Sequence, residues 1–272
     1  MNKSNISTVE SIKHDLVRCG LVSGDIVMLH ASVKAIGELV GGPDIVIKGI
    51  MDIIGSSGTL MMYVGWEDCP YHLKNWATAK QKAYLEALPP FDINIARAKR
   101  DHGILAEFLR TTPNTLRSQN PGASVCALGK HAKLITEHHP LNYGYGIDSP
   151  LHHLCQLNGK VLILGSPLAH ITLYHYAENL CNTPNKRIVR WKCPIIQNNE
   201  KIWVEIEEFD TSKGIVDWEG DYFPLITGDY IESRKIIASK VGNADSFLFN
   251  APDLNHFAVE WIEDKFSNLK KR

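Results

Sequence analysis

The clearest acid–base chemistry in this sequence comes from a histidine and a glutamate that lie three residues apart. His175 and Glu178 fall in a segment that we predict to be helical, Ile171–Leu180, so their side chains share one face of the helix. An imidazole titrates near neutral pH and a neighbouring carboxylate stabilises its protonated form, which suits general-base catalysis. A histidine at the edge of a core with an incidental acidic neighbour shows the same spacing. The pair by itself leaves both interpretations open.

A loop of small residues is a candidate binding site for a phosphate group. It runs from Ala31 to Gly37 (ASVKAIG), and Gly41 and Gly42 follow it. Small residues let the backbone approach a ligand, free N–H groups can hold a phosphate, and Lys34 adds a positive charge. The segment matches neither the GxxxxGK(S/T) nor the GxGxxG fingerprint. A polar turn between a strand and a helix explains the same residues.

Acidic side chains are concentrated in one later stretch of the chain. They are Glu205, Glu207, Glu208, Asp210, Asp217, Glu219 and Asp221, with Glu67 and Asp68 far upstream. Such a cluster is suited to a cleft that attracts a polycation. It is equally suited to a solvated face of the molecule.

Composition argues against several other classes of function. The formal net charge is -1 and the basic residues are dispersed, so we expect no contact with nucleic acid or with a membrane. The pairs His138-His139 and His152-His153 lack the HxxxH spacing of a metal site, and we expect no metal. None of the six cysteines forms a CxxC pair, which favours free thiols in a reducing compartment.

The elements that must position these groups alternate between strands and helices. We predict strands at Ile26–His30, Thr59–Val64, Ser124–Leu128 and Lys160–Leu164, and helices at Pro43–Ile54, Gly103–Arg110, Ala132–His138, Pro150–Leu157 and Ile171–Leu180. The alternation predicts an α/β fold with a mixed, partly parallel central sheet flanked by helices. Ligands of such sheets bind beyond the carboxyl ends of the strands, where the loop after His30 and the helix that carries His175 would both lie.

The rest of the chain departs from this alternation. Arg187–Ile196 and Lys201–Phe209 flank Asn198-Asn199-Glu200, which indicates a hairpin, and Asp210–Tyr222 is predicted to be a loop. Phe223–Val241 and Pro252–Phe266 are predicted to be helices around Ser246–Phe249. We expect one domain over residues 1–272, with a small excursion near residues 66–100 where Pro, Trp and Tyr break the periodicity.

We expect the N-terminal sequence to carry no targeting signal. Residues 1–17 are typical of an amphipathic helix and lack the long apolar segment of a signal peptide. No run of about 18 apolar residues could span a bilayer. We therefore expect a cytoplasmic protein.

At the two loops described above, the sequence resembles the aminoglycoside 3-N-acetyltransferases, a family of antibiotic N-acetyltransferases. The resemblance begins at GDIVMLHASVKAIGELVGGPDIV and continues through GTLMMYVGWEDCPY, PPFD, RSQNPGASVCALG, GYGIDSP, GKVLILGSPLAHITLYHYAE, PNKRIV and FDTSKGIVD to VEWIEDKF. It covers most of the chain in the right order. The combination of HxSxxxIG, which begins at His30, with HYAE, which begins at His175, is far more specific than either motif alone.

The resemblance implies an enzyme that acetylates the 3-amino group of the 2-deoxystreptamine ring of aminoglycoside antibiotics and so confers resistance. It implies acetyl-CoA as the co-substrate, no metal, no covalent acyl-enzyme, and an α/β fold distinct from the GNAT fold of many other N-acetyltransferases. The expected partners are an aminoglycoside and acetyl-CoA, and a homodimer is kept as a further candidate.

The resemblance also implies roles for individual residues. His175 matches the family's general base, with Glu178 beside it in the antibiotic cleft. The residues expected on the cofactor side are His30, Ser32, Val33, Lys34 and Ser118, of which Ser32-Val33-Lys34 match the segment that holds the pyrophosphate and pantetheine arm. The residues expected to bind the antibiotic are Trp66, Asp68, Tyr71, Asn120, Glu178, Asp210 and Asp217.

The sequence departs from the family pattern in three places. Asn120 replaces the histidine of the family's RSxHP motif, and an amide cannot carry a proton at neutral pH. His153 stands where the family often has the arginine of SPxxR. The stretch FDTSKGIVD is one residue longer than in relatives with DSNG, which makes the register from Asp210 to Asp217 less certain.

Direct acetyl transfer requires a neutral amine, and we hypothesise that His175 removes its proton directly or through a water. Glu178 would orient the imidazole, bind a sugar amine, or do both. Backbone N–H groups after the first strand, or the Ser32 hydroxyl, would bind the developing oxyanion. Three alternatives stay open. They are a CoA thioester hydrolase, a non-catalytic protein that binds aminoglycoside or acyl-CoA, and an acetyltransferase for a metabolite or peptide amine.

Overall fold

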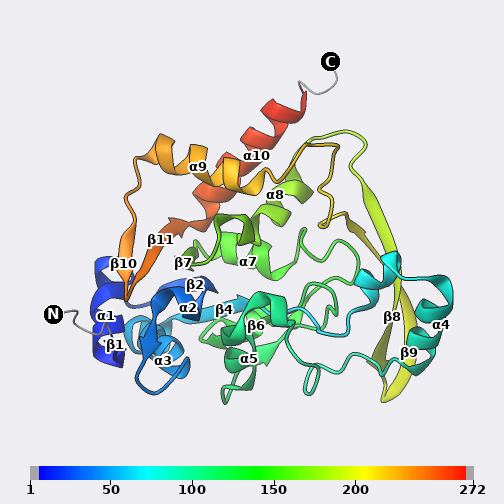
Figure 1. Cartoon of the computed structure of the whole chain (residues 1–272), viewed down its shortest axis with the longest axis horizontal. Coiled ribbons are helices and arrows are strands. Elements are labelled where there is room, and N and C mark those ends of the chain that lie inside the picture. Colours follow the sequence, from blue (N-terminus) through cyan, green and yellow to red (C-terminus); the bar gives the residue numbers. More distant parts are fainter. Residues whose placement is uncertain (1–5, 268–272) are drawn as a thin grey trace.

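Among residues 6–267, which are those that the computed structural model describes, seven strands form a mixed central sheet (Figure 1). Its order is β10-β11-β7-β2-β4-β6-β5. The bounds are β2 Ile26–Ala31, β4 Thr59–Tyr63, β5 Leu116–Arg117, β6 Val125–Gly129, β7 Lys160–Leu164, β10 Ser239–Val241 and β11 Ala244–Asn250. β2 runs parallel to both neighbours, β4 and β7, whereas all the outer pairings are antiparallel. The predicted fold class, a mixed and partly parallel sheet flanked by helices, is confirmed.

Helices cover both faces of this sheet. One face carries α1 Val9–Arg18, α3 Asp44–Ile54 and α5 Ile104–Thr111, and the other carries α6 Ala132–Glu137, α7 Pro150–Gln156, α8 Leu173–Leu180, α9 Phe223–Arg234 and α10 Ala251–Ser267. The apolar run of β2 explains the arrangement, because successive strand side chains point to opposite faces. Val27 and Leu29 enter the core beneath α1 and α3, whereas Ile26 and Met28 enter the core on the α8 side.

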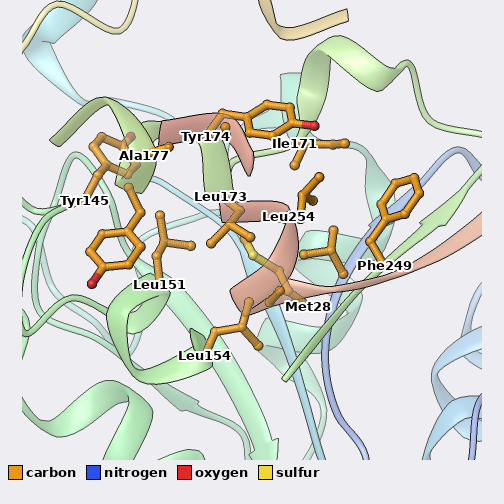
Figure 2. Close-up of a cluster of buried hydrophobic side chains, with 14 of the residues drawn as sticks. Met28, Tyr145, Leu151, Leu154, Ile171, Leu173, Tyr174, Ala177, Phe249 and Leu254 are labelled. Carbon is orange, nitrogen blue, oxygen red and sulfur yellow. The ribbon is translucent and has the colours of Figure 1, made fainter. Parts of the chain in front are cut away.

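The core on the α8 side fixes the helix that carries the candidate base. Figure 2 shows Met28 and Phe249 from the sheet packed near Leu173 of α8 and Leu254 of α10. Burial of each such side chain contributes roughly 1.5–3 kcal/mol. The Tyr174 hydroxyl lies 2.8 Å from the Thr227 hydroxyl, which joins α8 to α9. α8 is therefore held on the sheet by its buried side.

A hairpin and a short helix form a separate layer at one end of the molecule, on the right of Figure 1. Strands β8 Ile188–Gln197 and β9 Glu200–Phe209 pair antiparallel, and Asn198 and Asn199 make the turn with φ angles of 52° and 64°. The hairpin packs on the excursion near residues 66–100, which contains α4 Thr78–Ala87. α4 buries no residue fully, so apolar periodicity did not predict it.

The remaining elements are short. β1 Ile6–Ser7 and β3 Glu38–Leu39 pair in parallel, and α2 Val33–Ile36 follows β2. The 3₁₀ turns are η1 Gly55–Ser57, η2 Pro70–Asn75, η3 Arg100–His102 and η4 Leu168–His170. No helix among the described residues has the length and apolar character that crossing a bilayer requires.

Two predicted helices differ from the structure. The helix expected over Phe223–Val241 ends at Arg234, because Lys235 adopts a left-handed conformation with φ of 52°. The chain then enters the sheet edge as β10, so the second half of that prediction is wrong. The helix expected over residues 1–17 begins at Val9, capped by Thr8, and residues 1–5 lie outside the described part of the chain.

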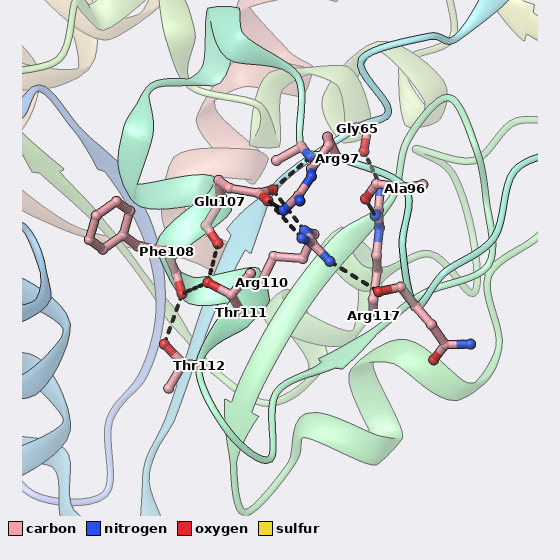
Figure 3. Close-up of polar contacts among 11 residues, drawn as sticks. Gly65, Ala96, Arg97, Glu107, Phe108, Arg110, Thr111, Thr112 and Arg117 are labelled. Atoms are coloured by element: carbon pink, nitrogen blue, oxygen red, sulfur yellow. Dashed lines mark hydrogen bonds and ion pairs between the residues drawn. The ribbon is translucent and has the colours of Figure 1, made fainter.

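An ion-pair network joins the end of the 66–100 excursion to α5 (Figure 3). Glu107 accepts hydrogen bonds from Arg110 at 2.6 and 2.7 Å, from Arg97 at 2.6 Å and from the Ala98 backbone N–H at 2.9 Å. Although partial burial alone would raise its pKa, these donors together lower the pKa of Glu107 to about 2. The Arg110 side chain is only 7% exposed, so it depends on this carboxylate.

A second buried arginine joins the same segment to the strand that leads to the cavity described below. Arg117 donates to the backbone carbonyls of Ala96 and Gly65 (Figure 3). Its Nε lies 3.2 Å from the Ser124 hydroxyl. Desolvation lowers the pKa of Arg117 to about 10, which still leaves it charged at neutral pH. Residues 96–98 are therefore held in place by the hydrogen bonds to Glu107 and by the hydrogen bond from Arg117 to the Ala96 carbonyl.

We expect Glu107→Gln to lower the free energy of unfolding at pH 7 by about 2 kcal/mol, because Arg110 then stays buried without a charged partner. The folded-state pKa lies below the ordinary 4.5, so the stabilisation is complete above that value and is lost as the pH falls toward about 2. Urea unfolding across this pH range measures both effects. Glu86→Gln, at an exposed pair with Lys82, is the control and should cost under about 0.5 kcal/mol. Equal losses in the two variants would contradict the assignment.

Candidate active site

A cavity of about 750 Å³ opens at the carboxyl ends of the parallel strands. Its wall is formed by the loop after β2, the residues that follow β4 and β7, the start of α8, and the inner face of the β8–β9 hairpin. The volume is within the range of small-molecule sites. The location is the one expected for ligands of an open α/β sheet.

His175 and Glu178 form a hydrogen-bonded pair at this cavity. His175 Nδ1 lies 2.6 Å from Glu178 Oε2, and Tyr222 donates its hydroxyl to Oε1 of the same carboxylate. Glu178 is 2% exposed and does not line the cavity, whereas His175 does. Because a carboxylate only accepts, Nδ1 carries the proton, and the described residues provide no hydrogen-bond partner for Nε2. In the neutral imidazole Nε2 is therefore the basic nitrogen, on the side of the ring away from Glu178, and His175 lines the cavity.

Aromatic side chains hold the ring of His175 in place. Its centroid lies 4.9 Å from that of Tyr145 and 5.0 Å from that of Phe223. Both aromatic residues line the cavity with it. The ring is therefore packed on two sides and hydrogen-bonded at Nδ1, which fixes the direction of Nε2.

The loop predicted to hold the cofactor lines the cavity as expected from its position. Ser32, Val33 and Lys34 are on the wall, and Ser32 Oγ accepts the Ala35 backbone N–H at 3.3 Å. The proton of the Ser32 hydroxyl stays available to a ligand, and Lys34 is exposed. This segment combines a cation with a hydroxyl donor at the entrance.

The cavity wall also contains a buried histidine, His30, and a half-buried one, His102. His30, predicted on the cofactor side, and His102 both line the cavity, and the Nε2 atoms of both are buried without a hydrogen-bond partner. Burial lowers the pKa of His30 to about 3 and that of His102 to about 4. Both imidazoles are consequently neutral at physiological pH.

Three of the residues predicted to bind the antibiotic, Trp66, Tyr71 and Asn120, lie on the cavity wall. Trp66 is buried against Phe91 with 5.4 Å between ring centroids. Tyr71 donates its hydroxyl to Asp210 at 3.0 Å. The wall on this side is therefore mainly aromatic, and its polar groups are already tied to neighbours.

Asn120 fastens a loop of the wall. Its amide N–H₂ donates to the Pro140 and Leu141 carbonyls at 2.6 and 3.2 Å. Its carbonyl oxygen accepts from the Gly122 and Ala123 backbone N–H groups at 2.9 and 2.8 Å. The asparagine that replaces the family's histidine thus has its donors and its acceptor engaged within the protein.

Four other predicted residues lie off the cavity wall. Ser118 is fully buried, where it accepts from the Val125 N–H and contacts His139 Nδ1 at 2.7 Å. Asp68 is exposed and accepts from the Tyr84 hydroxyl at 3.4 Å. Asp217 is fully exposed and pairs with Arg187, whereas Asp210 is buried.

Asp210 and Ser118 support residues that do reach the wall. Asp210 accepts from the Tyr71 hydroxyl and from the Ser212 hydroxyl at 2.6 Å, and both partners line the cavity. Ser118 helps to hold His139, whose Nε2 donates to the Gly144 carbonyl at 2.7 Å. Gly144 belongs to the same loop as Tyr145. Ser118 therefore supports the cavity wall indirectly, through His139.

Glu208 is a cavity residue that the sequence did not single out from its acidic neighbours. It is 4% exposed, lines the cavity, and accepts from the Phe209 backbone N–H at 2.9 Å. Burial raises its pKa to about 7, and no lysine or arginine of the described chain pairs with it. The available signal was strand alternation, because Glu208 shares a face of β9 with the buried Ile206.

The described residues contain no cluster of three or more His, Cys, Asp or Glu side chains arranged to hold a metal ion. The chemical resources of the cavity are instead a tethered imidazole, a buried carboxylate on the hairpin side, and hydroxyl and cationic groups on the loop after β2. This set is suited to removing a proton from a nucleophile that carries positive charge.

Asn120→Ala should lower the free energy of unfolding by about 2–3 kcal/mol, because buried N–H groups of residues 122 and 123 lose their acceptor. Calorimetric melting measures the loss. Gln119→Ala, at the exposed neighbouring residue, is the control and should change stability by less than about 0.5 kcal/mol. Matching stabilities for the two variants would show that Asn120 does not fasten the loop.

Comparison with known proteins places this arrangement among antibiotic-modifying enzymes. The family described as aminoglycoside 3-N-acetyltransferase matches residues 28–263. Aminoglycoside N(3)-acetyltransferase III of Pseudomonas aeruginosa is 46% identical over 250 residues, which cover 92% of this chain and 91% of that protein. Aminoglycoside N(3)-acetyltransferase VII of Streptomyces paromomycinus is 38% identical over 261 residues, covering 93% and 91%.

Solved structures show the same similarity. The structure described as "AAC-IIIb binary with CoASH" has a TM-score of 0.91 and 43% identity, and the match covers 96% of this chain and 98% of that one. The structure described as "AAC-VIa bound to Sisomicin" has a TM-score of 0.90 and 31% identity, with coverage of 95% and 98%. The first of these relatives therefore binds CoA and the second binds an aminoglycoside.

Proposed function

Because the chain belongs to the aminoglycoside 3-N-acetyltransferase family, we propose that it transfers the acetyl group directly from acetyl-CoA to the 3-amino group of the 2-deoxystreptamine ring, with His175 as general base. Aminoglycoside N(3)-acetyltransferase activity, which confers resistance, follows from the family itself. The observation that carries the mechanistic proposal is the pair at the cavity, in which Glu178 holds Nδ1 of His175 and leaves Nε2 toward the ligand space.

An aminoglycoside amine is largely protonated in neutral water, so it first gives one proton to solvent and attacks as the neutral amine. The chemical step then needs a base because the nitrogen becomes cationic as the C–N bond forms. As the amine nitrogen attacks the thioester carbonyl carbon, His175 Nε2 accepts the proton that the nitrogen loses. The C–S bond then breaks, and the proton on His175 neutralises the departing CoA thiolate. The products are the acetylated antibiotic and CoASH, and the imidazole returns to its neutral form.

The environment of Glu178 supports an orienting role for this carboxylate. Both of its oxygens are engaged, one by His175 and one by Tyr222, and the group is 2% exposed. A sugar amine would have to displace one of these partners to reach it. The carboxylate therefore fixes the imidazole and stabilises the imidazolium that forms during transfer.

The loop after β2 is the proposed site of acetyl-CoA. Ser32, Val33 and Lys34 line the cavity, and a relative with 43% identity binds CoASH. Lys34 would contact the pyrophosphate. The Ser32 hydroxyl, whose oxygen is already held by the Ala35 N–H, would donate to the thioester oxygen as negative charge develops there.

The hairpin side is the proposed site of the antibiotic. Glu208 is a buried carboxylate near the His175 imidazole, no lysine or arginine of the described residues pairs with it, and a polycationic ligand would add positive charge beside it. A relative with 31% identity binds sisomicin. A ligand ammonium beside Glu208 would favour the charged form of the carboxylate and would be held more weakly at high salt.

His175→Ala should reduce kcat/KM for sisomicin by about 10²–10⁴-fold, since the variant has no group to take the amine proton. The assay follows CoA release with and without antibiotic and the mass of the product. Release that depends on antibiotic, with a mass gain of one acetyl group, supports transfer. Release without antibiotic supports thioester hydrolysis. Activity of the variant within about tenfold of the native protein would contradict the base assignment.

Glu208→Gln should raise the KM for sisomicin about tenfold and leave the KM for acetyl-CoA unchanged, because only the antibiotic carries the complementary charge. Glu219→Gln, an exposed member of the same acidic stretch that does not line the cavity, is the control and should change neither constant. Equal effects of the two variants would indicate a diffuse acidic field in place of a specific site.

The Glu208→Gln substitution should also change how the free energy of unfolding depends on pH. The folded-state pKa of about 7 exceeds the ordinary 4.5, so the native protein loses stability as the pH rises between these values. Glu208→Gln removes this loss. Its stability relative to the native protein should therefore increase from pH 4 to pH 8, as measured by urea unfolding, and a constant difference would contradict the buried charge.

A further inference from the structure

Two tyrosines of the cavity wall form a hydrogen-bonded chain that ends on a backbone carbonyl. The Tyr145 hydroxyl lies 2.8 Å from the Tyr63 hydroxyl, and the Tyr63 hydroxyl lies 2.8 Å from the Gly122 carbonyl oxygen. Tyr63 and Tyr145 are separated by 82 residues and belong to β4 and to the loop after α6. Both side chains line the cavity.

The chemistry of the three groups fixes the direction of each proton. A carbonyl oxygen can only accept, so Tyr63 must donate its single hydroxyl proton to Gly122. Tyr63 then has only acceptor capacity left for its second contact, so Tyr145 must be the donor in the bond between the two hydroxyls. The oxygen of Tyr145 consequently has no proton to offer a ligand and keeps a lone pair for one.

The surroundings hold this arrangement rigidly. The ring of Tyr63 packs on His102 with 4.4 Å between centroids, and the ring of Tyr145 packs on His175 at 4.9 Å. The loop of Tyr145 is fastened by Asn120 and His139. Burial raises the pKa of both hydroxyls above the ordinary value of 10, so neither ionises at physiological pH.

A primary amine that attacks a thioester needs two acceptors. Its lone pair points at the carbonyl carbon, one N–H hydrogen passes to the base, and the second N–H hydrogen requires another partner if it is not to be buried unpaired. His175 Nε2 provides the first acceptor. The Tyr145 oxygen, on the ring packed against His175, is suited to provide the second.

We infer that Tyr145 binds the reacting amine through its oxygen, and that Tyr63 is the positioning residue that keeps this oxygen an acceptor. This inference rests on the proposed function and adds the geometry of attack to it. His175 and Tyr145 together direct the nitrogen lone pair toward the thioester. A wall of acceptors also selects an amine, which has hydrogens to donate, over an anionic nucleophile.

The experiment compares the native protein with Tyr145→Phe, Tyr63→Phe and the double variant. Tyr145→Phe should lower kcat/KM for sisomicin about tenfold and leave the KM for acetyl-CoA within twofold of the native value. Tyr63→Phe should lower kcat/KM by a similar factor, because the Tyr145 proton is released toward the cavity. Since Tyr63 acts through Tyr145, the double variant should be no worse than Tyr145→Phe alone.

Two further measurements separate this role from a structural one. Tyr230→Phe removes a hydroxyl that bonds to Asp253 on the α9–α10 side, away from the cavity wall, and should leave kcat/KM unchanged. Calorimetric titration of sisomicin into the CoASH complex should show about tenfold weaker binding for Tyr145→Phe. This binding measurement does not depend on turnover.

The outcomes distinguish the two levels of the proposal. If the native protein acetylates sisomicin and Tyr145→Phe matches it in both kcat/KM and binding, the role of Tyr145 is overturned and the proposed function stands. If the losses of the two single variants multiply in the double variant, Tyr63 does not act through Tyr145. If the native protein neither binds nor acetylates sisomicin, the proposed function fails and the inference fails with it.

Discussion

The hydrogen bond between His175 and a buried carboxylate determines which nitrogen of the imidazole can act as a base. Glu178 belongs to α8 and is 2% exposed, and its interaction with Nδ1 assigns the proton of the neutral imidazole to that nitrogen. An unpaired carboxylate in this position would be costly, but Tyr222 donates to its second oxygen and so completes the site. The ring is also packed between Tyr145 and Phe223. With Nδ1 occupied and the ring immobilised, Nε2 is the one imidazole atom free to receive a proton from a ligand.

In the proposed function, the central sheet and the β8–β9 hairpin together form the cavity in which this nitrogen meets the substrates. The parallel strands β2, β4 and β7 end at the same edge of the sheet, which places the loop of Ser32 and Lys34 near the start of α8. The β8–β9 hairpin closes the other side and contributes Glu208. In the proposed function, the loop with the positive charge of Lys34 binds acetyl-CoA and the hairpin with the carboxylate of Glu208 binds the antibiotic, and both line the cavity that contains His175. This separation of charge matches an acidic thioester cofactor and a cationic acceptor.

Much of the scaffold could be predicted from local pattern. The apolar runs of β2 and β7 and the motif that begins at His175 depend on neighbouring residues, and their periodicity is visible in the sequence. The end of α9 was not predictable in this way, because no glycine or proline follows Arg234 and the turn depends on a left-handed Lys235. α4 escaped prediction because it is a polar helix that buries no residue.

The candidate site was predictable only in part. The resemblance implies antibiotic-binding roles for Asp68 and Asp217, but a motif match does not tell which carboxylates face a cavity, and both lie off its wall. Asn120 lies on the cavity wall, as its predicted role in binding antibiotic requires, but the sequence does not reveal that its hydrogen bonds fasten the loop that carries Tyr145. The pairing of Tyr145 with Tyr63 depends on contacts between distant segments, which only the folded chain reveals.

The most direct test is the tautomer of His175 in the complex with CoASH at neutral pH. Protein labelled with ¹⁵N at histidine, compared with His175→Gln to assign the signals, reports which ring nitrogen carries the proton. The structure predicts a protonated Nδ1 and an unprotonated Nε2 for this residue. A proton found on Nε2, with Nδ1 bare, would leave no base facing the antibiotic and would contradict the mechanism.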